Sequence, residues 1–289
     1  MNVNWVSVNE HLKQWLKEDV GRGDCTTLGL RNTVQSLGRG YWISKAPGVI
    51  CGLPLAHRVF SILTDVSGTA HQLEFQPCIA EGMWVEAGRT IAKIQGNLSV
   101  LLTGERVALN LAMHLSGIAT ATRQYVQEIA DLPAQLVDTR KTTPGLRTLE
   151  KYAVKMGGGC NHRMGLDDAV MIKDNHIAAA GGIAKAINGV RSTMPYPMTV
   201  EVETENLEQV REALDNGADI IMLDNMVPDL MKEAVQLIRQ HNPGIKIEGS
   251  GNVTLATIRE IALTGVDYIS SSAPITRSPW LDLSMRLEH

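Results

Sequence analysis

Residues 198–224, MTVEVETENLEQVREALDNGADIIMLD, contain two apolar, strand-like runs separated by an amphipathic helical segment. A strand–helix–strand unit of this kind builds a parallel sheet, because the helix carries the chain back to the edge where the first strand began. Four similar runs occur elsewhere beyond residue 130: AQLVDT (134–139), AVMIK (169–173), IKIEGS (245–250) and VDYISS (266–271). The repetition predicts an α/β fold with a parallel sheet, either open or closed into a barrel.

The first part of the chain follows another pattern. After a short helical segment at 8–18, strand-like runs lie between glycine-rich turns in GRGYWISKAPGVICG (38–52), HQLEFQPCIAEG (71–82) and RTIAKIQG (89–96). This pattern is typical of a small α/β sandwich. From 98 to about 130, small and apolar residues recur at three- and four-residue spacing, which predicts a long, closely packed helix. A length of 289 residues fits one large barrel or two unequal domains.

Composition narrows the class of protein. With 44% hydrophobic and 20% charged residues, the chain has the balance of a soluble globular protein. Its net charge is −4 and it has no basic tail, so we expect no nucleic-acid partner. No stretch is apolar enough to cross a membrane and no signal peptide is evident, so a cytoplasmic location without a membrane partner is expected. No CxxC pair occurs among the four cysteines, which we expect to be free thiols: Cys25, Cys51, Cys78 and Cys160.

The charge reverses locally between residues 138 and 176, where seven lysines and arginines occur. Any one of them, taken singly, is as well explained by a surface salt bridge. Together they predict a site for an anion with two or more carboxylate or phosphate groups, since arginine binds such groups in a bidentate manner and lysine supplies a movable charge. The candidate cations are Arg106, Arg140, Lys141, Arg163 and Lys173.

Polar residues also mark the ends of the predicted strands, where active sites of α/β barrels are built. These residues are 138–141, Lys173, Glu201 with Glu203, Asp224, Glu248 with Ser250, and 270–272. We expect Glu203 and Asp224 to bind ribose hydroxyls or Mg²⁺. Glu201 is interpreted as the counter-ion of a neighbouring lysine. The loops in IEGSGNVT (247–254) and YISSSAPIT (268–276) expose backbone N–H groups ahead of expected helices, which suits phosphate.

Several of these runs closely resemble the quinolinate phosphoribosyltransferases, the decarboxylating nicotinate-nucleotide pyrophosphorylases of NAD biosynthesis. The resemblance extends from Glu18 to the end and rests on EDVGRGDCTT (18–27), GERVALNLAMHLSGIATATRQYV (104–126), DTRKTTPG (138–145) and GGGCNHRMGLDD (157–168). It implies the reaction of quinolinate with 5-phosphoribosyl 1-pyrophosphate to give nicotinate mononucleotide, pyrophosphate and CO2. It also implies an open barrel of about six parallel strands over 115–275 and an N-terminal α/β sandwich over 1–114, completed by 276–289.

The resemblance further implies which residues act. Lys141, Lys173, Glu203 and Asp224 would carry the chemistry, and the two carboxylates would hold Mg²⁺ directly or through water. Family members are homodimers or assemblies of dimers, in which the arginine that matches Arg106 reaches into the neighbouring site. The residues that match ligand contacts are Arg106, Thr139, Arg140, Lys141, His162, Arg163, Lys173, Glu203, Asp224, Ser250, Gly251, Asn252, Ser271, Ser272 and Ala273.

Three alternatives remain at this level. The first is a molybdenum-transport-associated paralogue of the same fold, against which the intact TRK and NHR runs count. The second is a catalytically silent scaffold, in which loss of cationic ligands would be expected. The third is nicotinate as the acceptor, which needs fewer cations. One departure from the family pattern is Ser272, which stands where the family resemblance expects a glycine, so a side chain is added where phosphate approaches the backbone.

Overall fold

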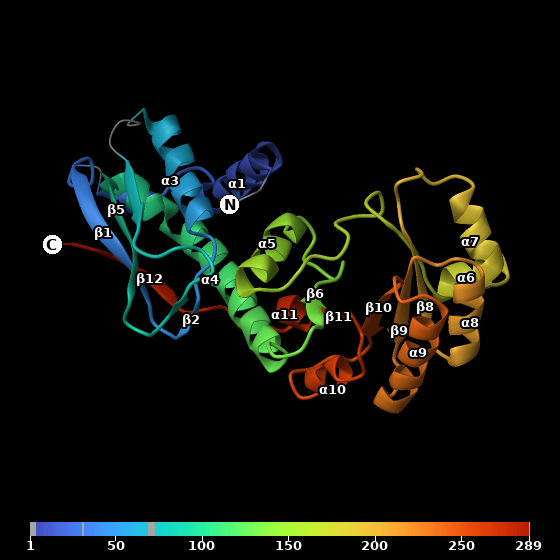
Figure 1. Ribbon diagram of the computed structural model, residues 1–289. Helices are drawn as coiled ribbons and strands as arrows, with labels where there is room; N and C mark the ends of the chain where they lie inside the picture. The colour runs from blue at the N-terminus through green and yellow to red at the C-terminus, as the bar shows by residue number, and fades with distance from the viewer. Residues whose placement is uncertain (1–3, 31, 69–72, 289) are drawn as a thin grey trace. The chain divides into compact units, whose positions relative to one another are not determined.

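The computed structural model describes residues 4–30, 32–68 and 73–288, so residues 71 and 72 of the second predicted strand run lie outside the described part. The chain divides into two units, which are described separately below (Figure 1). The first contains the residues up to Arg123, Thr143–Gly158 and the segment from Ser278 onwards. The second contains Gln124–Thr142 and Gly159–Arg277. Relative to the predicted boundary, the main difference is that Thr143–Gly158 packs with the first unit.

The second unit is built on a parallel sheet in the order β6-β11-β10-β9-β8-β7. Its strands are β6 Gln135–Val137, β7 Val170–Ile172, β8 Val200–Thr204, β9 Ile220–Asp224, β10 Lys246–Ser250 and β11 Tyr268–Ser270. The first and second strands in chain order, β6 and β7, therefore lie at the two edges. This confirms the predicted α/β class with an open arrangement of six parallel strands.

Helices cover the outer face of this sheet, and Figure 1 shows α8 and α9 running beside β8 and β9. The helices are α6 Asp174–Ala180, α7 Ile183–Arg191, α8 Leu207–Asp215, α9 Pro228–His241, α10 Ile258–Ala262 and α11 Ala273–Thr276. Val210 and Leu214 of α8 belong to the same buried apolar cluster as Val200 and Val202 of β8. The core of the unit thus lies between the sheet and the helices.

Because side chains alternate along a strand, the residues between these outward-facing ones point to the inner face of the sheet. On β8 the outward positions are Val200 and Val202, so Glu201 and Glu203 face inward. The inner face is accordingly rich in polar side chains, whereas the outer face is apolar. The strand pattern therefore explains why charged residues gather inside the barrel.

Residues 160–162 partly close the gap between β6 and β7. Cys160 forms an isolated parallel bridge with Val137 at the end of β6. The buried side chain of Asp138 then accepts hydrogen bonds from the His162 main-chain N–H at 2.9 Å and from Asn161 Nδ2 at 2.6 Å. Asp138 therefore fixes the loop that presents His162 and Arg163.

The first unit contains an antiparallel sheet in the order β12-β1-β5-β3, with helices packed against it. A separate two-stranded ladder joins β2 and β4. The elements are α1 Trp5–Val20, α2 Cys25–Gly29, β1 Leu37–Ser44, β2 Gly48–Val49, α3 Leu53–Ser67, β3 Glu74–Pro77, β4 Trp84–Val85, β5 Thr90–Asn97, α4 Leu98–Glu128, α5 Arg147–Gly157 and β12 Leu283–Leu287. The last turns of α4 belong to the second unit. None of the helices in the described ranges has the length and apolar character required to cross a membrane.

Helix α5 joins the first unit through close packing and buried hydrogen bonds. Tyr152 donates to Glu81 at 2.8 Å, and the fully buried Glu150 pairs with His114 at 2.9 Å. At Gly157, α5 passes so near α4 that a Cβ atom would lie 2.5 Å from the carbonyl oxygen of Ala119. Only glycine fits there without movement of one of the two helices.

Replacement of Gly157 by alanine should therefore lower the free energy of unfolding by about 1–3 kcal/mol, the usual cost of overpacking. Gly189 in α7 provides the matched control, because a methyl group added there would have no other atom within 4 Å. Gly189→Ala should raise stability by about 0.5–1 kcal/mol, since alanine is the better helix former. Urea titration of both variants checks the pair, and equal effects would contradict the packing argument.

Asp138 and Asn161 allow a test by exchange. Asp138→Asn brings two amide groups face to face, and Asn161→Asp brings two carboxylates face to face, so each should cost about 1–3 kcal/mol of stability. The double exchange restores a donor opposite an acceptor and should recover most of the loss. Thermal melting of the three variants measures this. A double variant that is no more stable than the less stable single variant would show that the Asn161–Asp138 hydrogen bond does not hold the loop.

Candidate active site

A pocket of about 720 Å³ opens at the carboxyl ends of the parallel strands in the second unit. Its lining residues are Thr139, Arg140, Lys141, His162, Arg163, Met171, Lys173, Glu203, Met222, Asp224, Asn225, Glu248, Ser250, Gly251, Asn252, Val253, Thr254, Ser270, Ser271, Ser272, Ala273 and Arg277. Five of these residues are lysine or arginine and three are acidic. The pocket therefore suits a strongly anionic ligand that also carries groups able to bind carboxylates.

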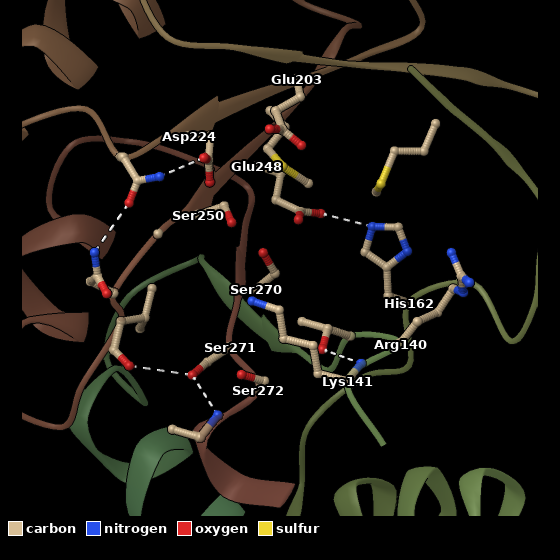
Figure 2. Close-up of a pocket in the computed structure, with 18 of the residues that line it drawn as sticks. Arg140, Lys141, His162, Glu203, Asp224, Glu248, Ser250, Ser270, Ser271 and Ser272 are labelled. Atoms are coloured by element: carbon tan, nitrogen blue, oxygen red, sulfur yellow. Dashed lines mark hydrogen bonds and ion pairs between the residues drawn. The ribbon is translucent and has the colours of Figure 1, made fainter. Parts of the chain in front are cut away.

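Figure 2 shows Glu203 and Asp224 at one end of the pocket and Arg140 and Lys141 at the other. Glu203 follows from the inward register of β8, and its carboxylate lies 3.5 Å from Nζ of the exposed Lys173. Burial raises the pKa of Glu203, although the ammonium of Lys173 works in the opposite direction. A partly buried carboxylate of this kind gains from any further cation or hydroxyl donor in the pocket.

The loops after β9 and β10 pack tightly together beside Asp224. Asn225 and Asn252 both have left-handed backbone conformations, with φ of 54° and 47°. Asn225 Nδ2 donates to Asp224 at 2.6 Å, while its Oδ1 accepts from Asn252 Nδ2 at 3.3 Å. Gly251, which precedes Asn252 in the loop after β10, has φ of 98°, and a Cβ there would lie 2.3 Å from Asn225 Oδ1. The glycine is required both by the backbone conformation and by the close approach of the loops.

The loop after β11 supplies the three predicted serine and alanine positions. The Ser271 hydroxyl is held within the loop, since it donates to the Val253 carbonyl at 3.4 Å and accepts from the Ala273 N–H at 3.2 Å. Ser272 is partly exposed and lines the pocket. Of the two neighbouring hydroxyls, that of Ser272 is therefore the one more open to a ligand.

Two arginines, Arg140 and Arg163, are the least exposed of the lysines and arginines that line the pocket. Arg163 is only 9% exposed, and its Nη1 donates to the Ala169 carbonyl at 2.9 Å. Burial and the nearby Arg140 guanidinium both lower the pKa of Arg163. The Nε atom of Arg140 is buried without a hydrogen-bond partner. Two neighbouring guanidinium groups, one with an unused donor, are well placed to bind carboxylates.

His162 lines the pocket and lies between two buried acids, Glu201 and Glu248. Its Nε2 is 3.2 Å from Glu201 and 3.3 Å from Glu248, and Figure 2 shows the contact with Glu248. Burial disfavours a charged ring, but the hydrogen bonds to both carboxylates outweigh it and raise the pKa of His162 to about 10. The N–H of Arg163 opposes this rise, because Nδ1 can accept it at 2.7 Å only while unprotonated. Nε2 carries a proton in either case.

The ligand atoms of His162, Glu201 and Glu248 lie within 4.8 Å of one another, a spacing that could also hold a metal ion. A histidine bound to metal through Nε2 donates the proton on its other ring nitrogen to an acceptor. Here Nδ1 faces a donor, the main-chain N–H of Arg163, at 2.7 Å. The arrangement is therefore that of a hydrogen-bonded cluster.

All of the predicted ligand residues except Arg106 line this pocket. Arg106 belongs to the first unit, on α4, whereas the described lining residues all come from the second. Glu201 is a counter-ion as expected, but its partner is His162, where a lysine had been expected. Nothing in the strand pattern identifies a partner that enters from a loop.

The sequence interpretation missed some lining residues, notably Glu248, Asn225 and Arg277 as ligand candidates. Glu248 and Asn225 stand at the ends of predicted strands, so their positions indicated the site, but neither residue was assigned a role. Arg277 had been placed in the C-terminal tail of the other domain. Its distance of one helical turn from the last phosphate-type loop was the only available indication.

Two family models match the chain: the quinolinate phosphoribosyl transferase N-terminal domain over residues 24–116 and the C-terminal domain over residues 118–286. A probable nicotinate-nucleotide pyrophosphorylase (carboxylating) from Synechocystis sp. is 60% identical over 283 residues, which cover 98% of this chain and 93% of that protein. A protein of the same description from Bacillus subtilis is 41% identical, with 98% and 94% covered.

Solved structures agree with the sequence relatives. The crystal structure of NadC from Streptococcus pyogenes has a TM-score of 0.92 and 39% identity, with 100% of this chain and 99% of that chain covered. Both matched family models describe the same enzyme, so the molybdenum-associated alternative has no support. The pocket geometry, the two family models and the relatives over nearly the whole length together show that the chain belongs to the quinolinate phosphoribosyltransferase family.

Proposed function

We propose that this chain joins quinolinate to the phosphoribosyl group of phosphoribosyl pyrophosphate and releases nicotinate mononucleotide, pyrophosphate and CO2. The observation that carries the proposal is a single pocket that is lined by two arginines, two carboxylates and small-residue loops. A pyridine dicarboxylate needs the arginines, and a sugar with phosphates needs the carboxylates and the loops. Nicotinate, with one carboxylate, would leave part of the cationic lining unused.

The side chains divide the work by charge. Arg140 and Arg163 bind the quinolinate carboxylates, and Lys141 and Lys173 lie between the quinolinate and phosphoribosyl positions. Glu203 and Asp224 accept hydrogen bonds from ribose hydroxyls. The backbone around Gly251 and the Ser272 region bind phosphate oxygens. With this assignment, the pyridine nitrogen and the anomeric carbon would meet in one pocket.

Reaction then depends on alignment and charge more than on a strong base. The pyridine nitrogen attacks the anomeric carbon with its lone pair, and the bond to pyrophosphate breaks with its electrons on the leaving oxygen. The lysines stabilise that leaving group. Once the ring nitrogen is alkylated, its positive charge favours loss of the adjacent carboxylate as CO2. The electrons of the broken carbon–carbon bond stay on ring C2, which takes up a proton from solvent to give the product, and the protein holds the ring in place during this step.

Mg²⁺ is the metal that this donor set suits. Glu203 and Asp224 offer carboxylate oxygens on neighbouring strands, and oxygen ligands shared with substrate phosphates are what Mg²⁺ prefers. Because burial raises the pKa of Glu203, a nearby dication would be favourable there. When bound, the ion would neutralise charge on the pyrophosphate group.

Arg106 and the oligomer belong to the same proposal. We infer that the chain acts as a homodimer, or an assembly of dimers, in which Arg106 of one subunit reaches the site of its partner. The residue lies on α4 in GERVALN, and the described lining of the pocket does not include it. A dicarboxylate held by a third arginine would be more fully neutralised.

The four cysteines are free, which supports a reducing, cytoplasmic location.

The purified protein should form nicotinate mononucleotide from quinolinate, phosphoribosyl pyrophosphate and Mg²⁺, and should form none after addition of EDTA. Arg140→Ala should lower kcat/KM for quinolinate by about 100-fold or more, since a charged hydrogen bond is worth ~1.5–3 kcal/mol and a bidentate guanidinium would make two with a carboxylate. Chromatographic product analysis measures this, with exposed Arg211→Ala of α8 as control. Equal turnover of nicotinate would contradict the assignment of quinolinate as acceptor.

Complementation tests the shared site. Arg106→Ala and Asp224→Asn should each be inactive alone. In a heterodimer of the two, one site would carry both changes and the other neither, so an equimolar mixture refolded together should regain roughly a quarter of wild-type activity. If Arg106 serves its own subunit, every site carries one change and the mixture stays inactive. Separate dimers mixed without refolding provide the control.

A further inference from the structure

Arg277 lines the pocket but has no role in the assignment above, although it carries a full positive charge. It directly follows α11, and its main-chain N–H donates to the Ala273 carbonyl at 3.0 Å, which fixes its backbone to the loop after β11. The side chain itself is exposed. Among the residues that the structure describes, neither a hydrogen bond nor an ion pair engages the guanidinium. Its N–H donors are therefore available to a ligand.

Tyr125, in the same unit, helps to locate the guanidinium. Tyr125 is only 8% exposed, and burial raises the pKa of its hydroxyl. The Arg277 guanidinium opposes this rise, as does a hydrogen bond with the backbone of Leu255. Leu255 directly follows Thr254, which lines the pocket in the loop after β10. Arg277 therefore lies beside the two loops that follow β10 and β11.

These two loops contribute only neutral residues to the lining of the pocket: 250–254 after β10 and 270–273 after β11. The other cations of the lining come from the segments around β6 and β7, namely Arg140, Lys141, Arg163 and Lys173. Arg277 is thus the lining cation that follows the two loops along the chain.

A phosphate monoester bound at the two loops needs charge as well as hydrogen bonds, because it carries nearly two negative charges at neutral pH. The loops offer main-chain N–H groups and the Ser272 hydroxyl, which are neutral donors. Helix α11 has four residues, so its dipole adds little. Charged donors bind such a group about twice as strongly as neutral ones. The loops therefore lack a cationic partner for phosphate unless Arg277 supplies it.

We propose that the Arg277 guanidinium binds the phosphate monoester of phosphoribosyl pyrophosphate, which is the phosphate that remains on the product. This inference rests on the proposed function, since it names a further binding residue of the same site. The ester lies at the opposite end of the ribose from the bond that breaks. Arg277 would therefore hold substrate and product alike and would make the site select nucleotides over nucleosides.

Two rival roles predict other patterns of binding. If Arg277 held the leaving pyrophosphate, its loss would weaken phosphoribosyl pyrophosphate binding but spare nicotinate mononucleotide, which contains no pyrophosphate. If the side chain were only solvated at the surface, its loss would change neither. Nicotinate riboside, the mononucleotide without its phosphate, isolates the contact, because a side chain that binds the phosphate has nothing to lose with this ligand.

The experiment measures by calorimetry the binding of nicotinate mononucleotide and of nicotinate riboside to the wild type and to Arg277→Ala. We expect the variant to bind the mononucleotide about tenfold to 100-fold more weakly and the riboside within about twofold of wild type. The difference between the two ligands measures the interaction of Arg277 with the phosphate. Arg277→Lys keeps the charge but loses the planar fork, so its affinity should be intermediate. Exposed Arg211→Ala is the control and should match the wild type.

Steady-state assays give a second measurement that does not depend on the weakly bound riboside. In Arg277→Ala, KM for phosphoribosyl pyrophosphate should rise about tenfold or more, whereas KM for quinolinate should stay within about twofold of wild type. If Arg277→Ala melts early, Arg277→Lys is judged by the same comparisons.

Unchanged affinity for the mononucleotide, or equal weakening of mononucleotide and riboside, would overturn the assignment of Arg277. So would weaker binding of phosphoribosyl pyrophosphate with unchanged binding of the mononucleotide, which would place Arg277 at the pyrophosphate. In each of these cases the wild type still forms nicotinate mononucleotide, so the proposed function stands. A wild-type protein that neither forms nor binds the mononucleotide would instead overturn the proposed function.

Discussion

The hydrogen bonds that join His162 to Glu201 and Glu248 lie on the inner face of the parallel sheet, and they link two of its strands to the loop that carries His162. Strand alternation turns both acids inward, so they must be satisfied there or remain costly. The ring that satisfies them comes from a loop between β6 and β7, not from a strand. The Asp138 side chain fixes that loop by accepting a hydrogen bond from the main-chain N–H of His162. The loop between β6 and β7 therefore supplies the hydrogen-bond partner that the two buried acids need.

In the first unit, too, a carboxylate joins separate elements by hydrogen bonds, and there its role is structural. Glu81 accepts hydrogen bonds from the N–H groups of Gly52 and Leu53 at the start of α3, at 2.8 and 3.0 Å, and from Tyr152 of α5. An acid at a helix N-terminus is favourable because unpaired N–H groups and the helix dipole both point to it. Burial and the nearby Glu81 carboxylate raise the pKa of Tyr152, so the phenol remains a donor. These contacts of Glu81 all lie within the first unit.

Much of the architecture could be predicted from the sequence because strands and their ends have a periodic signal. The runs ending at Glu203 and Asp224 identified both the parallel sheet and its functional edge. The membership of Thr143–Gly158 in the first unit could not be predicted, because it depends on the close contact of Gly157 with α4. The partner of Glu201 was missed for a similar reason, since His162 is far away in sequence. Arg277 follows a short helix with no periodic signal.

The pairing of β12 with β1 has a consequence for the order in which the protein forms. The whole of the second unit lies between the two strands in sequence. During synthesis the second unit is therefore complete before the strand that finishes the first sheet has left the ribosome. Until then β1 presents an unpaired edge, the kind of surface on which chains associate wrongly. The N-terminal unit begins first and is finished last.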